Sequence, residues 1–191
     1  MKPLDHSHPT PNHQNNNPIS HIILSLQEIS INTYMKKLDS LNQVADFHRT
    51  FHHPIEKTPT IPAEKRCELR VSLLAEELDE LRQAIKEKDL VEIADALCDL
   101  QYVLSGAVLE FGLGEKFVDL FNEVQRSNMS KSCASMEEAE ATRIHYKKTK
   151  GVDSYIKKSG DQFLVFRQED DKTLKSVNYS PADLKRILEL D

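Results

Sequence analysis

Two rows of acidic side chains are the part of this sequence whose residue types and spacing can support chemistry. The first row is Glu76, Glu77 and Glu80, and the second row is Glu92, Asp95 and Asp99. At about 100° per residue in an α-helix, Glu77 and Glu80 share one flank, with Glu76 about 40° beyond Glu80. The second row falls within an arc of about 60°. Asp79 points to the opposite flank and is expected to stay in solvent.

The second row predicts a bound cation, because it lies in a stretch that otherwise resembles core sequence. Between Val91 and Leu109 the only other polar side chains are Gln101, Tyr102 and Ser105. A buried, unpaired carboxylate costs several kcal/mol. If a short turn joins two antiparallel helices, the two rows face one another across a cleft. Hard divalent cations prefer oxygen ligands and bridge to phosphates, so we expect Mg²⁺, with Mn²⁺ as a possible substitute.

Other interpretations of the acidic rows stay open at this stage. Acidic runs are common on solvated helix faces, and Glu92 can act as the capping-box partner of Asp89. A di-iron carboxylate bundle requires Glu-x-x-His motifs, and no histidine follows these acids at that spacing, which disfavours it. The main alternative is a non-catalytic helical domain that binds metal or a basic partner through its acidic groove.

Helices are the elements that must position these acids. Apolar residues recur at three- and four-residue spacing, and the segment that carries the second row is apolar nearly all round, which is typical of a buried helix. Asp89 is the expected N-cap of that segment. The expected helices run from Leu38 to a stop at Pro54, then over about 63–88, 90–111, 115–125 and 137–147.

The C-terminal part of the chain has a different pattern. Apolar residues alternate on both sides of Asp170-Asp171-Lys172, which predicts a β-hairpin from Phe163 to Val177. Ser180-Pro181-Ala182-Asp183 predicts a helix that Ser180 caps and that runs to the end of the chain. The expected fold class is therefore mainly α, a four- to five-helix bundle followed by a small C-terminal β-hairpin plus helix.

The N-terminal segment is rich in proline, asparagine and histidine, and we expect it to be disordered. Met35 stands directly before the periodic sequence and is a candidate for the true first residue. The expected organisation is a disordered extension over 1–35, an all-α domain over 36–150 and a hairpin–helix appendix over 151–191.

Composition disfavours several classes of function. The chain has 25 Lys and Arg against 31 Asp and Glu, a net charge of −6, which disfavours binding of nucleic-acid polymers. No apolar run reaches the roughly 18 residues of a membrane span, and we find no signal peptide. Cys67, Cys98 and Cys133 are odd in number and far apart, which predicts reduced thiols. We therefore expect a cytoplasmic protein without membrane or nucleic-acid partners.

The acidic motifs resemble those of a known superfamily. Glu76-Glu77-Leu78-Asp79-Glu80, followed by Glu92-Ile93-Ala94-Asp95, is similar to the Glu-Glu-x-x-Glu … Glu-x-x-Asp signature of the all-α nucleoside triphosphate pyrophosphohydrolases. This superfamily includes MazG, phosphoribosyl-ATP pyrophosphohydrolase and the dimeric dUTPases, and it implies a MazG-like bundle. Further similar stretches, which extend the resemblance over about 38–131, are Asp46-Phe47-His48 to Phe51 with Pro54, Asp95 to Gly106, and Val124 with Ser127-Asn128-Met129-Ser130-Lys131.

A second register of the motif lies one helical turn further along the chain. Asp99-Leu100-Gln101-Tyr102 is similar to the family's Glu-x-x-Asp-Leu-Leu-Tyr, with Ala96 where the glutamate is expected. Either the pair Glu92/Asp95 or the pair Asp95/Asp99 therefore completes the implied metal site, and Asp95 belongs to both.

The resemblance implies hydrolysis of a nucleotide between its α- and β-phosphates, which gives a monophosphate and pyrophosphate. The implied proton acceptor is Glu76 or Glu77, and the implied Mg²⁺ ligands are Glu77, Glu80, Asp95 and either Glu92 or Asp99. The implied substrate contacts are Arg126, Asn128, Lys131, Tyr102 and His48, with His48 at the edge of the cleft. Removal of dUTP or dCTP and a step of histidine synthesis both stay open as roles. The resemblance also implies a homodimer or a dimer of dimers, in which a second subunit completes the site.

Overall fold

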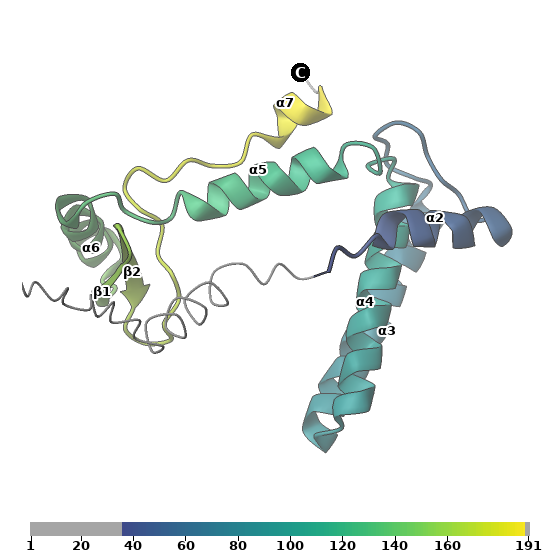
Figure 1. Cartoon of the computed structure of the whole chain (residues 1–191), viewed down its shortest axis with the longest axis horizontal. Helices are drawn as coiled ribbons and strands as arrows, with labels where there is room; N and C mark the ends of the chain where they lie inside the picture. The colour runs from purple at the N-terminus through teal and green to yellow at the C-terminus, as the bar shows by residue number, and fades with distance from the viewer. Residues whose placement is uncertain (1–35, 190–191) are drawn as a thin grey trace, which may run out of the picture. The chain divides into compact units, whose positions relative to one another are not determined.

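The computed structural model describes residues 36–189. From residue 39 onward these residues belong to one compact unit. The predicted extension over 1–35, with Met35, lies outside these described residues. The helices and strands are α2 (Ser40–Thr50), α3 (Glu64–Glu87), α4 (Leu90–Glu110), α5 (Phe117–Met129), α6 (Met136–Lys150), β1 (Ser154–Ser159), β2 (Gln162–Arg167) and α7 (Leu184–Leu188) (Figure 1). The mainly α class with a small C-terminal hairpin is confirmed.

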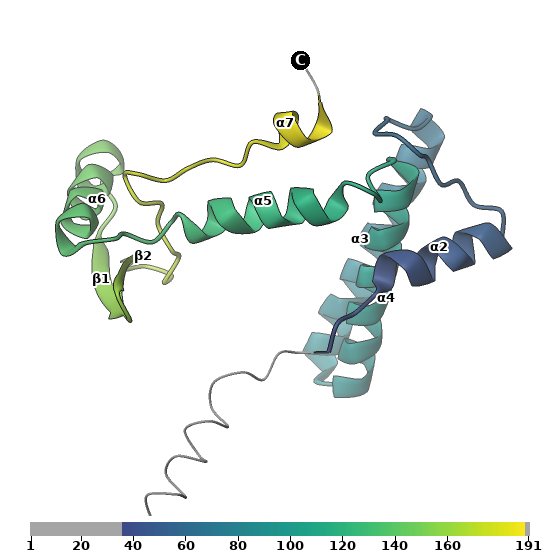
Figure 2. The same ribbon diagram turned by 45° about the horizontal axis from the view of Figure 1, so that its top comes forward.

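α3 and α4 form a long helical hairpin, and they run side by side in both views (Figures 1 and 2). Lys88 ends α3 in the left-handed region (φ 59°), and the Asp89 side chain accepts hydrogen bonds from the backbone N–H of Val91 and of Glu92. The predicted capping box is wrong in one respect. The Asp89 N–H donates to the carbonyl oxygen of Ala84, and this leaves Glu92 without the capping role.

α2 packs against α4 and, with the loop that follows it, completes the first apolar core. Val44, Ala45, Leu109 and the half-buried Ile55 form this core. The loop is attached to the end of α4 by backbone hydrogen bonds. Gly112 permits this close approach, because a Cβ at that position (φ 67°) would lie 1.8 Å from the carbonyl oxygen of Thr58.

The expectation that α4 is buried on all sides is wrong for a single chain, because one side of the helix is exposed. Leu90 is 77% exposed and Leu97 is 52% exposed, and Val91 and Leu104 are also exposed. α2 and α3 are the helices that pack on α4, and they cover only part of its circumference.

α6 packs against both strands of the β-hairpin, around a second core of Cys133, Ala139, Val165 and Leu174. β1 and β2 are antiparallel, with Ser154 opposite Arg167 and a turn at Gly160. The hairpin predicted around Asp170-Asp171-Lys172 is therefore wrong. The chain does turn there, but beyond it only Thr173 pairs with Phe166, because the chain then leaves the sheet edge to pack Leu174 into the core.

The C-terminal helix is shorter than the sequence predicted. α7 spans Leu184–Leu188, and Asp183 caps it by accepting from the Arg186 N–H. Ser180 is not the cap, because its N–H donates to Ser130 Oγ and its Oγ accepts from Arg126. α7 packs on α5, and Lys116 Nζ donates to the carbonyl oxygen of Ile187 at 2.9 Å.

Candidate active site

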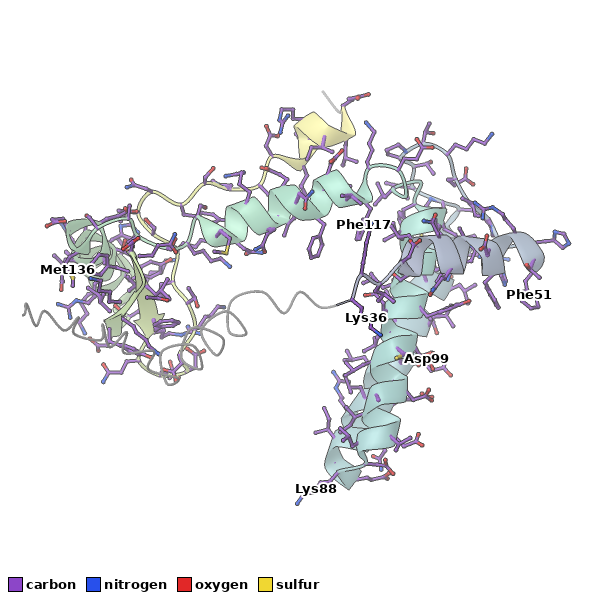
Figure 3. The ribbon with its side chains drawn as sticks, viewed as in Figure 1. Lys36, Phe51, Lys88, Asp99, Phe117 and Met136 are labelled. Atoms are coloured by element: carbon purple, nitrogen blue, oxygen red, sulfur yellow. The ribbon has the colours of Figure 1, made fainter. Side chains whose placement is uncertain are left out.

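The two acidic rows lie on the antiparallel helices α3 and α4. Glu77 on α3 and Asp99 on α4 are half-buried, and the other four carboxylates of the two rows are exposed. Figure 3 shows Asp99 about midway along α4. Asp79 is exposed and pairs with Arg82, in agreement with its expected solvation.

Acidic side chains of both rows act electrostatically on the carboxyl group of Glu77. Burial raises the pKa of Glu77, and the negative charges of Asp99, Glu80, Glu76 and Asp95 raise it further. Two of these neighbours come from α3 and two from α4, so the hairpin brings both rows to one carboxyl group. Ionised carboxylates in this arrangement repel one another, and a bound cation is the natural relief.

The donor set fits Mg²⁺ held jointly with a phosphate. Among residues 36–189, no three carboxylate, histidine or cysteine side chains are arranged as a closed metal-binding group. Mg²⁺ does not need one, because it keeps several water ligands and is usually held by one or two carboxylates plus substrate phosphates. Carboxylates that surround Glu77 from two helices meet that requirement.

His48 lies in the interior, where α2, α3 and α4 meet, and not at the edge of a cleft. It is 2% exposed, its Nδ1 lies 2.8 Å from the carbonyl oxygen of Pro54, and its Nε2 lies 3.3 Å from Nη2 of Arg70. Gly106 makes room for these groups, because a Cβ there would lie 2.6 Å from Nη1 of Arg70. We therefore give His48 a structural role and no substrate contact.

A buried ion-pair network continues from His48. Glu110, 1% exposed, accepts hydrogen bonds from Arg66 and from the buried Arg70. Burial raises the pKa of Glu110, but the hydrogen bonds from Arg70 and Arg66 outweigh it and leave that pKa lowered. Burial lowers the pKa of His48, against the hydrogen bond to Pro54, and the charge of Arg70 lowers it further.

This network is what the sequence reasoning missed. Two signals for it were present, since Arg66 and Arg70 stand one helical turn apart, and Glu110 ends a long apolar stretch with no basic residue near it in sequence. The pairing joins residues 40 or more positions apart, which helical periodicity does not reveal.

Tyr102 lies one turn beyond Asp99 on α4, partly exposed. Its ring makes an edge contact with Phe47 of α2, with 5.6 Å between ring centroids. Its contact with a substrate stays a prediction.

The three predicted substrate contacts after α4 lie at the end of α5. Lys131 is half-buried, and its Nζ donates to Oδ1 of the exposed Asn128 at 2.7 Å. Arg126 has its donors engaged by the carboxylate of Glu123, by Ser180 Oγ and by the carbonyl oxygen of Pro181. Arg126 therefore attaches the C-terminal segment to α5, whereas Asn128 and Lys131 stay candidates for substrate contacts.

Comparison with known proteins shows what the segment that holds these elements is similar to. Residues 44–128 match the family described as phosphoribosyl-ATP pyrophosphohydrolase. This part of the chain is therefore similar to the MazG-like and phosphoribosyl-ATP pyrophosphohydrolase-like superfamily, and the class of activity that the match suggests is nucleotide pyrophosphohydrolysis. The chain is also similar to the uncharacterized protein L479 of Acanthamoeba polyphaga mimivirus, at 24% identity over an aligned length of 252, with 82% of this chain and 98% of that protein covered.

None of the helices in the described range 36–189 has the length and hydropathy that a membrane span requires.

Proposed function

We propose that this protein is a Mg²⁺-dependent nucleotide pyrophosphohydrolase that cleaves between the α- and β-phosphates of a nucleoside triphosphate or a phosphoribosyl-ATP-like nucleotide. The observation that carries the proposal is the convergence of four carboxylates on Glu77 within the family-matched segment. Such an arrangement is poor for folding alone and well suited to a phosphate-bound cation.

Each acidic residue has a proposed role. Glu80, Asp95 and Asp99 hold the cation, which supplies neutralisation of the phosphate charge when it is bound. Of the two registers of the motif we favour Asp95/Asp99, because both of these α4 carboxylates act on Glu77. Glu92 is not among the carboxylates whose charges raise the pKa of Glu77, so it stays the second choice as a ligand.

Glu77 is the proposed proton acceptor, with its neighbour Glu76 as the alternative. A carboxylate whose pKa is raised is a better base at neutral pH, because the optimal pKa for proton transfer is close to the working pH. Glu77 takes a proton from the attacking water, whose oxygen bonds to the α-phosphorus. The bond from that phosphorus to the bridging oxygen breaks, and pyrophosphate leaves with the bridging oxygen.

We further propose that the working protein is a homodimer or a dimer of dimers. The apolar side chains Leu90, Val91, Leu97 and Leu104 stand exposed on α4, and Val118 and Phe121 stand exposed on α5. Monomeric proteins rarely leave so many large apolar groups in water, and association of two copies covers them. The free thiols, of which Cys98 is exposed, are in keeping with a cytoplasmic location, which we also propose.

The test is a panel of substrates with product identification. Pyrophosphate release is measured from ribo- and deoxyribonucleoside triphosphates and from phosphoribosyl-ATP, with Mg²⁺, with Mn²⁺ and with EDTA. We expect release from at least one nucleotide that EDTA abolishes and that Asp95→Ala loses. The best substrate then distinguishes removal of dUTP or dCTP from a biosynthetic role. Absence of release from every nucleotide by folded protein would overturn the proposal.

A further inference from the structure

A second charged site lies in the C-terminal part of the chain, built from residues that the catalytic proposal mostly leaves unused. A cavity of about 310 Å³ opens between the end of α6, the end of β2 and the segment that follows β2. Its lining residues are Lys131, Tyr146, Lys150, Val152, Arg167, Lys172, Thr173, Leu174 and Lys175. Five of these nine side chains are cationic, and none is a carboxylate.

The cations of this cavity differ from the other basic residues nearby. Arg167 is paired with Asp170, but among the described residues no carboxylate lies within ion-pair distance of Lys131, Lys150, Lys172 or Lys175. A neighbouring cavity shows the contrast.

That neighbouring cavity is lined by Arg143 and Lys147, and it also contains Asp153, which pairs with Lys147 at 2.7 Å. Arg143 is itself paired with Glu140. Positive charge there is thus neutralised within the chain, whereas in the 310 Å³ cavity only Arg167 of the five basic residues has an ion-paired carboxylate among the described residues.

The backbone that carries these cations is fixed before any ligand arrives. The Lys175 N–H donates to the hydroxyl of Tyr146, and the Lys172 carbonyl accepts from the Arg167 N–H at 2.9 Å. The carbonyl of Lys131 accepts from the N–H of Ser176. Three chain segments that are distant in sequence are therefore held together with their basic residues around one space, which is the backbone preorganisation that anion binding needs. The Nζ of Lys131 donates to Oδ1 of Asn128, and the Nζ of Lys175 lies 4.2 Å from the centre of the Tyr179 ring.

We propose that this cavity binds a condensed phosphate, that is, a pyrophosphate or triphosphate group. Its volume is at the lower end for small-molecule sites, which suits a compact anion better than a large ligand. Basic residues carried by several segments around the cavity match the several oxygens of a condensed phosphate. The group has two possible sources, the triphosphate of a bound nucleotide or free pyrophosphate, and the first of these rests on the proposed function.

The primary test is calorimetric binding of inorganic pyrophosphate to the full chain, without divalent cations and at low salt. We expect one site per chain. Lys150→Gln combined with Lys172→Gln should weaken binding at least about tenfold, because each lysine lost removes a charge-assisted contact. The matched control is Lys148→Gln combined with Lys157→Gln, two exposed lysines of α6 and β1 outside the cavity, which should bind as the wild type does.

A kinetic measurement distinguishes the two sources of phosphate. If the cavity holds the substrate's triphosphate, the Lys150/Lys172 double variant raises KM and leaves kcat nearly unchanged. If it holds free pyrophosphate, KM is unchanged and inhibition by added pyrophosphate weakens. Binding in the absence of metal does not require turnover, so this site can be confirmed even where the hydrolase proposal fails.

Three results would overturn the proposal. The first is no binding of pyrophosphate or tripolyphosphate by the wild type, and the second is an equal loss of binding in the control variant. The third is tighter binding of a single-stranded oligonucleotide than of pyrophosphate through Lys150 and Lys172, which would assign the cavity to a nucleic acid instead.

Discussion

At the scale of single residues, Glu77 connects stability with the proposed chemistry. Its pKa is raised, so its contribution to stability is full below the pKa of the unfolded chain and is lost as pH rises through the folded-state value. The ionised form of Glu77 therefore opposes folding when no cation is present.

Glu77→Gln should accordingly stabilise the metal-free protein slightly and inactivate it. We expect a gain of under about 1 kcal/mol, because the side chain is only half-buried and solvent screens its neighbours. Thermal unfolding with EDTA measures the gain, and Glu68→Gln, an exposed glutamate on the same helix, should leave the Tm unchanged. A lower Tm for Glu77→Gln than for Glu68→Gln would contradict the account.

The buried network of His48, Arg70 and Glu110 predicts acid sensitivity. The lowered pKa of His48 contributes stability that is full above its ordinary value of 6.5 and is lost as pH falls below it. The lowered pKa of Glu110 adds a second loss, which begins below about 4.5. Glu110→Gln should cost about 3 to 5 kcal/mol at neutral pH, because it leaves the buried charge of Arg70 without its partner.

Thermal unfolding between about pH 7 and about pH 5 tests the histidine part of this prediction. The wild-type Tm should fall over this range, and His48→Gln should start lower and fall less. The exposed His52 offers the matched control, since His52→Gln should follow the wild type. An equal decline in all three proteins would show that His48 is not the group that titrates.

At the scale of elements, two glycines with the same φ angle distinguish the cost of a left-handed backbone from the cost of a steric collision. Gly112 and Gly151 both have φ 67°, but an added Cβ would collide with Thr58 only at Gly112. Gly151→Ala should cost about 1 to 2 kcal/mol from the left-handed backbone alone. Gly112→Ala should cost clearly more, because the loop after α2 must also leave the end of α4. Chemical denaturation measures both, and equal costs would contradict this reason.

The elements that the sequence predicted well are those with local signals at both ends. The α3–α4 hairpin follows Pro62, turns at the Asp89 cap and ends before Gly112, and its predicted bounds agree with the structure to within a residue or two. β1 was missed because its sequence, Ser-Tyr-Ile-Lys-Lys-Ser, alternates only weakly. The alternating apolar residues after Lys172 predict a strand, whereas tertiary packing of Leu174 decides the path of this segment.

The same reasoning applies to the two charged sites. Four of the proposed acidic residues stand within two short helical stretches, so helical spacing alone could place them together. The 310 Å³ cavity is lined by Lys131, Lys150 and Lys175 from separate segments, and no periodicity in the sequence connects these lysines. Sites of this second kind require the tertiary structure.

At the scale of the whole molecule, the exposed apolar side chains of α4 predict self-association. Light scattering during gel filtration should give a multiple of the 21.9 kDa monomer mass. Leu97→Asp combined with Leu104→Asp should shift the protein toward the monomer, because two charges would be buried in the interface. Ile144→Asp on α6, which is also exposed and apolar, is the control and should keep the wild-type mass. A wild-type mass of one chain would contradict the proposed assembly.

The central claim is metal-dependent cleavage between the α- and β-phosphates by the acids of α3 and α4. The most direct measurement is ³¹P NMR of the products from the best nucleotide, with Mg²⁺ and with EDTA, for the wild type, Asp95→Asn and the control Asp79→Asn. We predict a nucleoside monophosphate and pyrophosphate, no reaction with EDTA, a rate loss of at least about 100-fold in Asp95→Asn, and a near wild-type rate in Asp79→Asn. A diphosphate with orthophosphate as products, or equal rates in the two variants, would contradict it.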